Sequence, residues 1–259
     1  MNRTTPFKAE ADFEQELKVF ANKYKSTLAE HSKRISDYFE MSCYHLIIRY
    51  YETRGYQTEV QNLIHKKFRF KCSPVGLLSN FSFFKATKTD KAGKIESVFI
   101  FHNATVQSAF DKNIFTTPDI VVSKTSEPSI STNHYASDKM RLSYVSREDL
   151  VTFCEAKHLM PFPELMVGFI GTVLELKPEC ITGKIMIEVS DHLAPSLMMS
   201  GTYGKPTSTI RDSFEKRYYV NLLDNLFDPY TMKRVVSKTH IDENATLGKK
   251  SKRVSDYDV

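Results

Sequence analysis

Two fragments of the sequence place acidic residues inside apolar, β-branched stretches: residues 117–122 (TPDIVV) and 151–157 (VTFCEAK). Side chains on a strand alternate between two faces, so Glu155 and Lys157 point the same way. Asp119 joins them on that face if the two strands are neighbours. Three charges at one spot on buried strands are costly unless something holds them together. A divalent cation between the two carboxylates, with the ammonium beside a bound water, would do so.

The Glu-x-Lys spacing alone does not identify such a centre, because it occurs three times: Glu16/Lys18, Glu155/Lys157 and Glu175/Lys177. The first and third pairs lie in segments with helical patterns, where residues two apart occupy different faces. Only the middle pair lies on an expected strand, after a Pro-Asp strand and before a helix. The alternative interpretation stays open from the sequence: two strand-end acids that reach solvent, with Lys157 as a surface ion-pair partner.

Two helices are expected to flank these strands. Residues 32–53 carry an apolar stripe at helical spacing, and Gly55 is a natural stop for that helix. Residues 165–176 are apolar nearly all round, which is typical of a helix packed against a sheet and under other elements. The stripe of the first helix consists of Ile35, Phe39, Cys43, Leu46, Ile47 and Tyr50.

Strands are expected where β-branched and aromatic residues concentrate. They cover residues 81–86, 97–106, 120–123 and 150–156, with a turn at 90–94 (DKAGK) between the first two. The polar stretch after Lys124, up to about residue 149, has no period and predicts a long excursion between two buried strands.

Other patterns predict further elements, namely helices over residues 9–25 and 207–216 and short strands over residues 56–63, 185–189 and 218–223. The tail from about Thr239 carries KKSKR without core-forming residues, which indicates disorder. The sequence therefore predicts one α/β domain over residues 1–238 and a flexible basic tail over residues 239–259.

The order of a helix, strands, Pro118-Asp119, a strand with Glu155-Ala156-Lys157 and an apolar helix resembles the PD-(D/E)XK nuclease superfamily. The resemblance covers roughly residues 32–225. It implies a restriction-endonuclease-like core, in which a mixed central sheet is flanked by helices. It also implies hydrolysis of DNA phosphodiester bonds, and a restriction or phage-defence role.

Carried over by position, the resemblance implies that Asp119, Glu155 and the carbonyl of Ala156 bind Mg²⁺, with Mn²⁺ able to substitute. Lys157 would orient or deprotonate the attacking water. A hard cation prefers oxygen ligands, lowers the pKa of its bound water and offsets charge on the phosphate.

Many family members use a further acid from the helix before the sheet. Glu40 is the first candidate for it here, and Glu59 is the second. The gap between Asp119 and Glu155 is longer than usual for the family, which leaves Asp149 as an alternative acid on that side.

The bulk composition fits this hypothesis without proving it. The net charge of +5 suits a polyanionic partner. The basic, aromatic segments 66–71 and 211–219 could follow a phosphate backbone, while a solvated helix or strand face explains each segment taken singly. The four scattered cysteines suggest neither a zinc site nor a disulfide framework. We find no signal peptide and no apolar stretch long enough to cross a bilayer, so a cytoplasmic protein is expected.

DNA is the expected partner, with a homodimer or an activating protein as further possibilities. Two other interpretations stay open. One is a catalytically inactive nucleic-acid-binding subunit on the same fold, and the other is a protein-interaction scaffold.

Overall fold

The computed structural model describes residues 35–72, 76–132, 134, 141–182 and 192–226. The helix expected over residues 9–25, the strand expected over residues 185–189 and the basic tail lie outside these described residues. Among the described helices, none is long and apolar enough to span a membrane.

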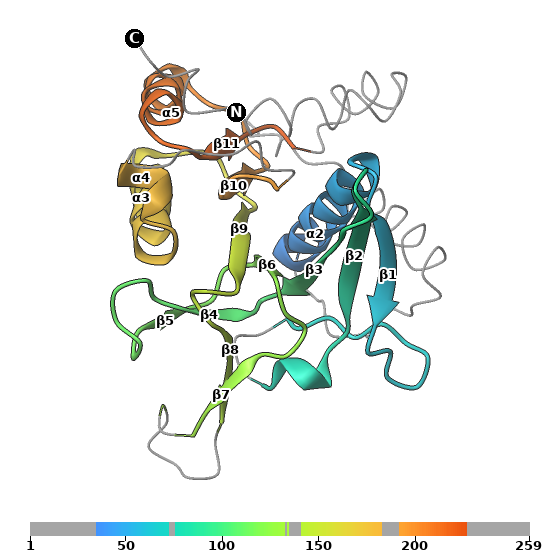
Figure 1. Cartoon of the computed structure of the whole chain (residues 1–259). Coiled ribbons are helices and arrows are strands. Elements are labelled where there is room, and N and C mark those ends of the chain that lie inside the picture. Colours follow the sequence, from blue (N-terminus) through green and yellow to red (C-terminus); the bar gives the residue numbers. More distant parts are fainter. Residues whose placement is uncertain (1–34, 73–75, 133, 135–140, 183–191, 227–259) are drawn as a thin grey trace.

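A mixed sheet of seven strands forms the centre of the fold (Figure 1), in the order β1-β2-β3-β6-β9-β10-β11. Neighbours from β1 to β9 are antiparallel, whereas β9, β10 and β11 run parallel. The strands are β1 (Gln57–Gln61), β2 (Phe83–Thr89), β3 (Ile95–His102), β6 (Ile120–Ser123), β9 (Leu150–Lys157), β10 (Ser196–Met199) and β11 (Asn221–Leu223). The prediction of a mixed sheet flanked by helices is therefore confirmed.

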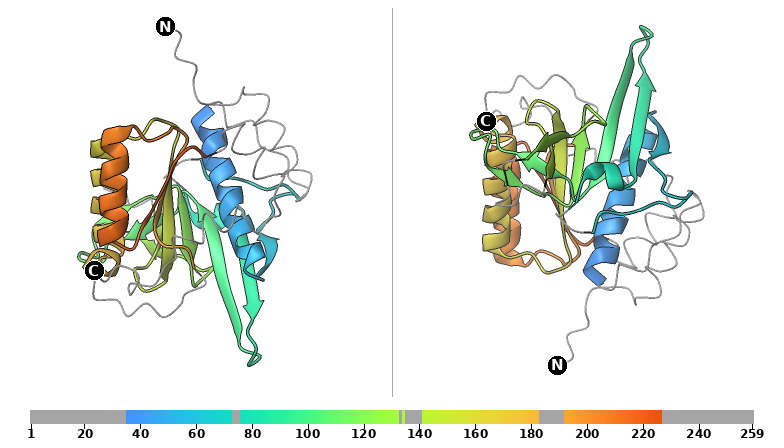
Figure 2. Two further views of the ribbon diagram at one scale, coloured as in Figure 1. Left: turned by 90° about the horizontal axis from the view of Figure 1, so that it is seen from above. Right: turned by 90° about the horizontal axis from the view of Figure 1, so that it is seen from below.

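Helices cover both faces of this sheet (Figure 2). Helix α2 (Ile35–Thr53) lies on one face, while α3 (Pro163–Leu176) and α5 (Lys205–Arg217) lie side by side on the other. The alternation along β9 separates the two cores, because Cys154 and Ala156 pack with α2 whereas Phe153 packs with α3. The short helix α4 (Glu179–Thr182) follows α3.

Helix α2 forms as its apolar stripe predicts, and it ends as Gly55 predicts. Phe39, Cys43 and Ile47 are at most 1% exposed. Gly55 adopts φ +82°, and its N–H donates to the carbonyl of Glu52 while the N–H of Tyr56 donates to that of Tyr51. This pair of bonds is a Schellman motif, which satisfies two carbonyls at the end of the helix.

Helix α3 forms where it was predicted, beginning two residues earlier at Pro163, but it is less enclosed than its composition suggested. Met166, Phe169 and Val173 are buried against the sheet. Val167 and Leu174, on the outer face, are 58% and 41% exposed. The helix is therefore packed on one side rather than covered all round.

A second sheet of four strands, ordered β5-β4-β8-β7, corrects two predictions. The single strand expected over 97–106 divides at Asn103, whose φ of +49° turns the chain out of the main sheet. The polar stretch after Lys124 contains two strands rather than only a loop. The second sheet consists of β4 (Thr105–Gln107), β5 (Phe115–Thr116), β7 (Ser129–Ser131) and β8 (Leu142–Val145).

Several boundaries differ from the prediction for local reasons. The strand expected over 218–223 is only β11, because Tyr218 still closes α5 by donating its N–H to the carbonyl of Phe214. Strand β10, the helical turn η1 (Leu78–Asn80) and α4 were not predicted. They span only three or four residues each, too few to show a period. The turn at 90–94 is confirmed: Asp90 accepts from the backbone N–H groups of Ala92 and Lys94.

The core beneath α2 should tolerate little loss of volume. Phe84 is fully buried among the rings of Tyr44 and Phe68. We expect Phe84→Ala to lower the free energy of unfolding by about 3–5 kcal/mol, measured by urea titration. The matched control is Phe110→Ala, because Phe110 is 67% exposed and the same change there should cost at most about 0.5 kcal/mol. Equal losses in the two variants would contradict this description of the core.

Candidate active site

The strand register brings the two predicted acids face to face. In the antiparallel pair β6–β9, Ile120 is opposite Cys154 and Val121 is opposite Phe153. Continuing this register by one residue places Asp119, just before β6, opposite Glu155. The strands expected to carry these two acids are therefore neighbours in the fold.

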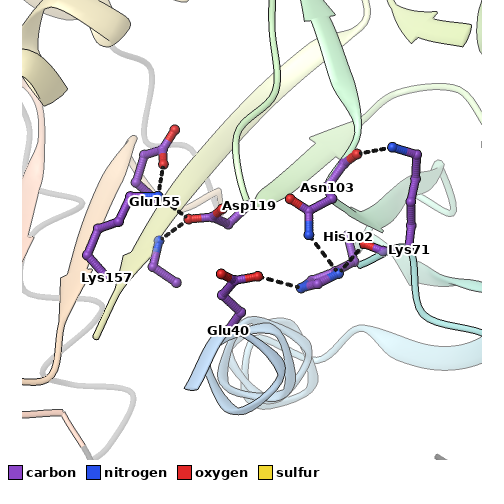
Figure 3. Close-up of polar contacts among 8 residues, drawn as sticks. Glu40, Lys71, His102, Asn103, Asp119, Glu155 and Lys157 are labelled. Carbon is purple, nitrogen blue, oxygen red and sulfur yellow. Dashed lines mark hydrogen bonds and ion pairs between the residues drawn. The ribbon is translucent and has the colours of Figure 1, made fainter. Parts of the chain in front are cut away.

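Lys157 joins the two carboxylates (Figure 3). Its Nζ lies 2.8 Å from Oδ2 of Asp119 and 2.8 Å from Oε2 of Glu155. The backbone N–H of Ala156 donates to the same Oδ2 of Asp119 at 2.7 Å. One carboxylate oxygen of Asp119 is thus fixed by two donors from β9. The site is therefore built by strand β9 and by the residue just before its neighbour β6.

Burial sets the electrostatics of this cluster. The side chains of Asp119 and Glu155 are only 10% and 15% exposed. Burial and then the Asp119 charge raise the pKa of Glu155 to about 7, although Lys157 acts in the opposite direction. For Lys157, burial lowers the pKa, but the two carboxylates outweigh it and hold the pKa above its ordinary value. Lys157 is therefore an ammonium ion at neutral pH.

The donors present fit a magnesium ion held in part by water. Mg²⁺ in proteins is commonly bound through one or two carboxylates and keeps several waters. Asp119 and Glu155 supply the two carboxylates, and the repulsion that raises the pKa of Glu155 is what a cation would relieve. Among the described residues there is no group of three or more His, Cys, Asp or Glu side chains placed to hold a metal. A metal here would depend on these two acids.

Glu40, the further acid that the resemblance implies, comes from helix α2 and not from the strands. Its Oε2 is 3.8 Å from Nε2 of His102 (Figure 3). The described residues show no metal-binding group that unites it with Asp119 and Glu155. Its role as a ligand stays a prediction, and its position beside the buried His102 is the observed fact.

The two alternative acids do not lie at the centre, which corrects those suggestions. Glu59 is on the edge strand β1, where its side chain is 60% exposed and pairs with Lys85 at 3.7 Å. Asp149 precedes β9 at the end away from Glu155, and its Oδ2 accepts a hydrogen bond from Ser146 at 2.7 Å. Three strands lie between β1, which carries Glu59, and β9, which carries Glu155. Asp149 is separated from Glu155 by most of the length of β9. Both acids instead have local structural partners.

His158, the residue after β9, contacts α2 and Ser200 and not the paired carboxylates. Its ring lies 6.1 Å from that of Phe39 on α2, and its Nδ1 is 3.2 Å from Oγ of Ser200. Burial lowers the pKa of His158. These contacts give it a packing role beside the site.

A polar cluster next to Asp119 was missed by the sequence analysis. The N–H of Asn103 donates to the carbonyl of Asp119 at 2.8 Å, from the strand on the other side of β6. Lys71 donates to the carbonyl of Asn103 at 2.7 Å, and Nδ1 of His102 lies 2.9 Å from the carbonyl of Lys71. Burial lowers the pKa of Lys71 to about 8.

The signal that could have identified this cluster is Asn103 itself. It is a turn-forming residue in the middle of an otherwise apolar strand, and asparagine tolerates positive φ better than most residues. The sequence does not distinguish Lys71 from the other lysines of the basic, aromatic run 66–71. Only the structure shows that Lys71 is buried whereas Lys66 and Lys67 are exposed.

These residues define a class of site: paired carboxylates and a lysine on adjacent strands at the centre of an α/β fold. Comparison with protein-family models, curated proteins and solved structures finds no match for the chain. What the site does chemically is therefore inferred from its geometry.

The raised pKa of Glu155 makes the stability of the metal-free protein depend on pH. The carboxyl group ionises near pH 4.5 in the unfolded chain but near 7 in the folded one. Its contribution to stability is full below about pH 4.5 and is lost as the pH rises through about 7. In a chelator, the Tm of the wild type should fall from about pH 5 to about pH 8 by several degrees more than that of Glu155→Gln.

The matched control for this experiment is Glu164→Gln, since Glu164 is an exposed glutamate in the first turn of α3. Its pH profile should follow the wild type. Mg²⁺ favours the ionised carboxylate, so it should raise the Tm more at about pH 8 than at about pH 5. Identical pH profiles for the wild type and Glu155→Gln would refute the assigned electrostatics.

Proposed function

We propose that the protein is a metal-dependent nuclease that hydrolyses phosphodiester bonds in DNA. The observation that carries this proposal is the contact of Lys157 with both Asp119 and Glu155 at 2.8 Å. The carboxylates of Asp119 and Glu155 are largely withdrawn from solvent, which is costly for charged groups, and a buried charge cluster is weak evidence for stability. A site that concentrates two carboxylates and an ammonium despite that cost suits chemistry on a charged substrate.

The order of elements around the site supports a restriction-endonuclease-like core. Helix α2 precedes the antiparallel strands β2, β3 and β6, and β6 pairs with β9. Helix α3 then connects β9 to the parallel strand β10. This is the arrangement that the PD-(D/E)XK resemblance implies, with the Pro-Asp residue and the Glu-x-Lys pair on neighbouring strands.

Each side chain has a definite part in this proposal. Asp119 and Glu155, with the Ala156 carbonyl, would hold Mg²⁺, which when bound would acidify a water and offset charge on the phosphate. The N–H of Ala156 fixes the orientation of Asp119. Lys157, held protonated by its neighbours, donates hydrogen bonds and stabilises negative charge. The raised pKa of Lys157 thus favours the orienting role of this lysine over deprotonation of the water.

We propose DNA and not RNA as the substrate, and a role in defence, because the family resemblance implies both. A homodimer and an activating protein partner are likewise proposals. The net charge of +5 favours a polyanionic substrate in general.

A second candidate is a nucleic-acid-binding protein on the same fold without catalysis. It is favoured by the absence, among the described residues, of a third acidic, histidine or cysteine ligand beside Asp119 and Glu155. In that case Lys157 would serve as the permanent counter-ion of the two carboxylates. The two candidates differ in metal-dependent turnover.

We expect purified wild-type protein to nick or linearise plasmid DNA in Mg²⁺ or Mn²⁺, and not in chelator. Lys157→Ala and Glu155→Ala should each reduce the cleavage rate by roughly 10²–10⁴-fold, the scale of losing one proton-handling or charge-stabilising group. Gel quantification of supercoiled plasmid gives the rates, and far-UV circular dichroism reports whether each variant is folded.

The matched control is Lys112→Ala, which removes the same charge from an exposed position. Cleavage by folded Lys157→Ala at the wild-type rate would refute the proposed centre. If no form cuts, Mg²⁺ titration by calorimetry separates the remaining cases. Binding lost in Glu155→Ala indicates an enzyme that needs an activator, and no binding indicates the non-catalytic protein.

A further inference from the structure

A groove of about 750 Å³ opens at the far end of the two strands that carry the site. It is bordered by the start of β9 at Leu150 and Val151, and by the end of the hairpin formed by β2 and β3. Val151 is four residues from Glu155, which at the rise of a strand is roughly 13 Å. The groove is therefore separate from the paired carboxylates.

Lysines from four parts of the chain line this groove. Lys88 lies on β2 and Lys94 in the hairpin turn, while Lys124 follows β6 and Lys177 follows α3. Segments distant in sequence thus bring the same charge to one concave surface, and two acids, Asp90 and Glu96, share the lining.

Both acids are engaged by donors of the protein itself. Asp90 accepts from the backbone N–H groups of Ala92 and Lys94 within the turn. Glu96 accepts from the hydroxyl of Tyr56 at 2.7 Å and contacts His192 at 3.0 Å. These contacts fix the positions of both carboxylates and leave their charges in place, so the lining sets four lysines against two acids.

The lysine charges are compensated to different degrees. Lys177 pairs with Glu179 at 2.9 Å. Lys124 donates to a backbone carbonyl, that of Glu148, at 3.0 Å, which leaves its charge in place. In the part of the chain that the structure describes, neither Lys94 nor Lys124 pairs with a carboxylate, and both are exposed. The groove thus presents positive charge to solvent.

We propose that this groove is a second binding site, specific for the phosphate groups of a polyanionic ligand. Lysines act on phosphate as mobile point charges and need no fixed fork geometry, so a groove lined by lysines suits a phosphate chain rather than one oriented carboxylate. A nucleic-acid backbone that followed the groove would reach the paired carboxylates about four base pairs away, at roughly 3.4 Å per base pair. The site goes beyond the proposed nuclease function, because it assigns binding at a place where no cleavage occurs.

The test measures binding in chelator, so that its outcome is independent of cleavage. Fluorescence anisotropy of two labelled duplexes of unrelated sequence gives Kd across a salt series for the wild type and Lys94→Gln/Lys124→Gln. The control is Lys112→Gln/Lys205→Gln, which removes the same charge from exposed positions outside the groove and outside the basic segments 66–71 and 211–219. Inorganic tripolyphosphate, followed by calorimetry, probes the same groove with a small phosphate chain. Thermal unfolding confirms that each variant is folded.

For a nucleic-acid backbone, we expect the groove variant to bind both duplexes roughly ten- to a hundredfold more weakly at about 0.1 M salt. The slope of log K against log salt should fall by about two, one unit per lost phosphate contact. The control should lose much less. If tripolyphosphate binding disappears in the groove variant while duplex binding does not change, the site holds but takes a small polyphosphate. Equal behaviour of the groove and control variants towards both probes would overturn the proposal.

Discussion

The balance of charge between Asp119, Glu155 and Lys157 is the constraint around which the centre of the molecule is built. Two carboxylates directly opposite each other on buried strands repel, and burial increases the cost. The chain offsets this cost with an ammonium from the same strand as Glu155 and with the N–H of Ala156. The compensation is incomplete, since the pKa of Glu155 still rises to about 7. A cation bound here would relieve the remaining repulsion, and it would have to share the two carboxylates with Lys157, whose Nζ contacts both.

The apolar layers on both faces hold this arrangement in register. Cys154 and Ala156 pack with α2, while Phe153 packs with α3. A slip of β9 by one residue would exchange these faces and drive Glu155 into the core beneath α2. The hydrophobic pattern that stabilises the fold is therefore also what sets Glu155 opposite Asp119. Asn103 and Lys71 extend the polar row across the sheet, because Asn103 binds the backbone of Asp119 and Lys71 binds that of Asn103.

The two ends of β6 and β9 differ in their chemistry. One end holds the paired carboxylates, whose charges are balanced mainly by Lys157. The other end meets the groove, where Lys94 and Lys124 face solvent. Under the two proposals, one surface would attract a phosphate chain and the other would act on it, with β6 and β9 spanning the distance between them.

The sequence by itself determined the elements whose periods are long enough to be recognised. Helix α2 with its stop at Gly55, the strand at 120–123 and the strand that carries Glu155 and Lys157 all follow from local alternation or helical spacing. Local spacing also determined that Glu155 and Lys157 share a face. These features depend on residues within a few positions of one another, so one sequence suffices to reveal them.

Only the tertiary structure decided which strands are neighbours and which acids meet. It excluded Glu59 and Asp149, placed Glu40 beside His102, and brought Lys71 and Asn103 next to Asp119. It also formed a second sheet from strands of two to four residues, including two in a stretch with no visible period. Such short strands gain stability from partners far along the chain, and a local pattern carries no information about those partners.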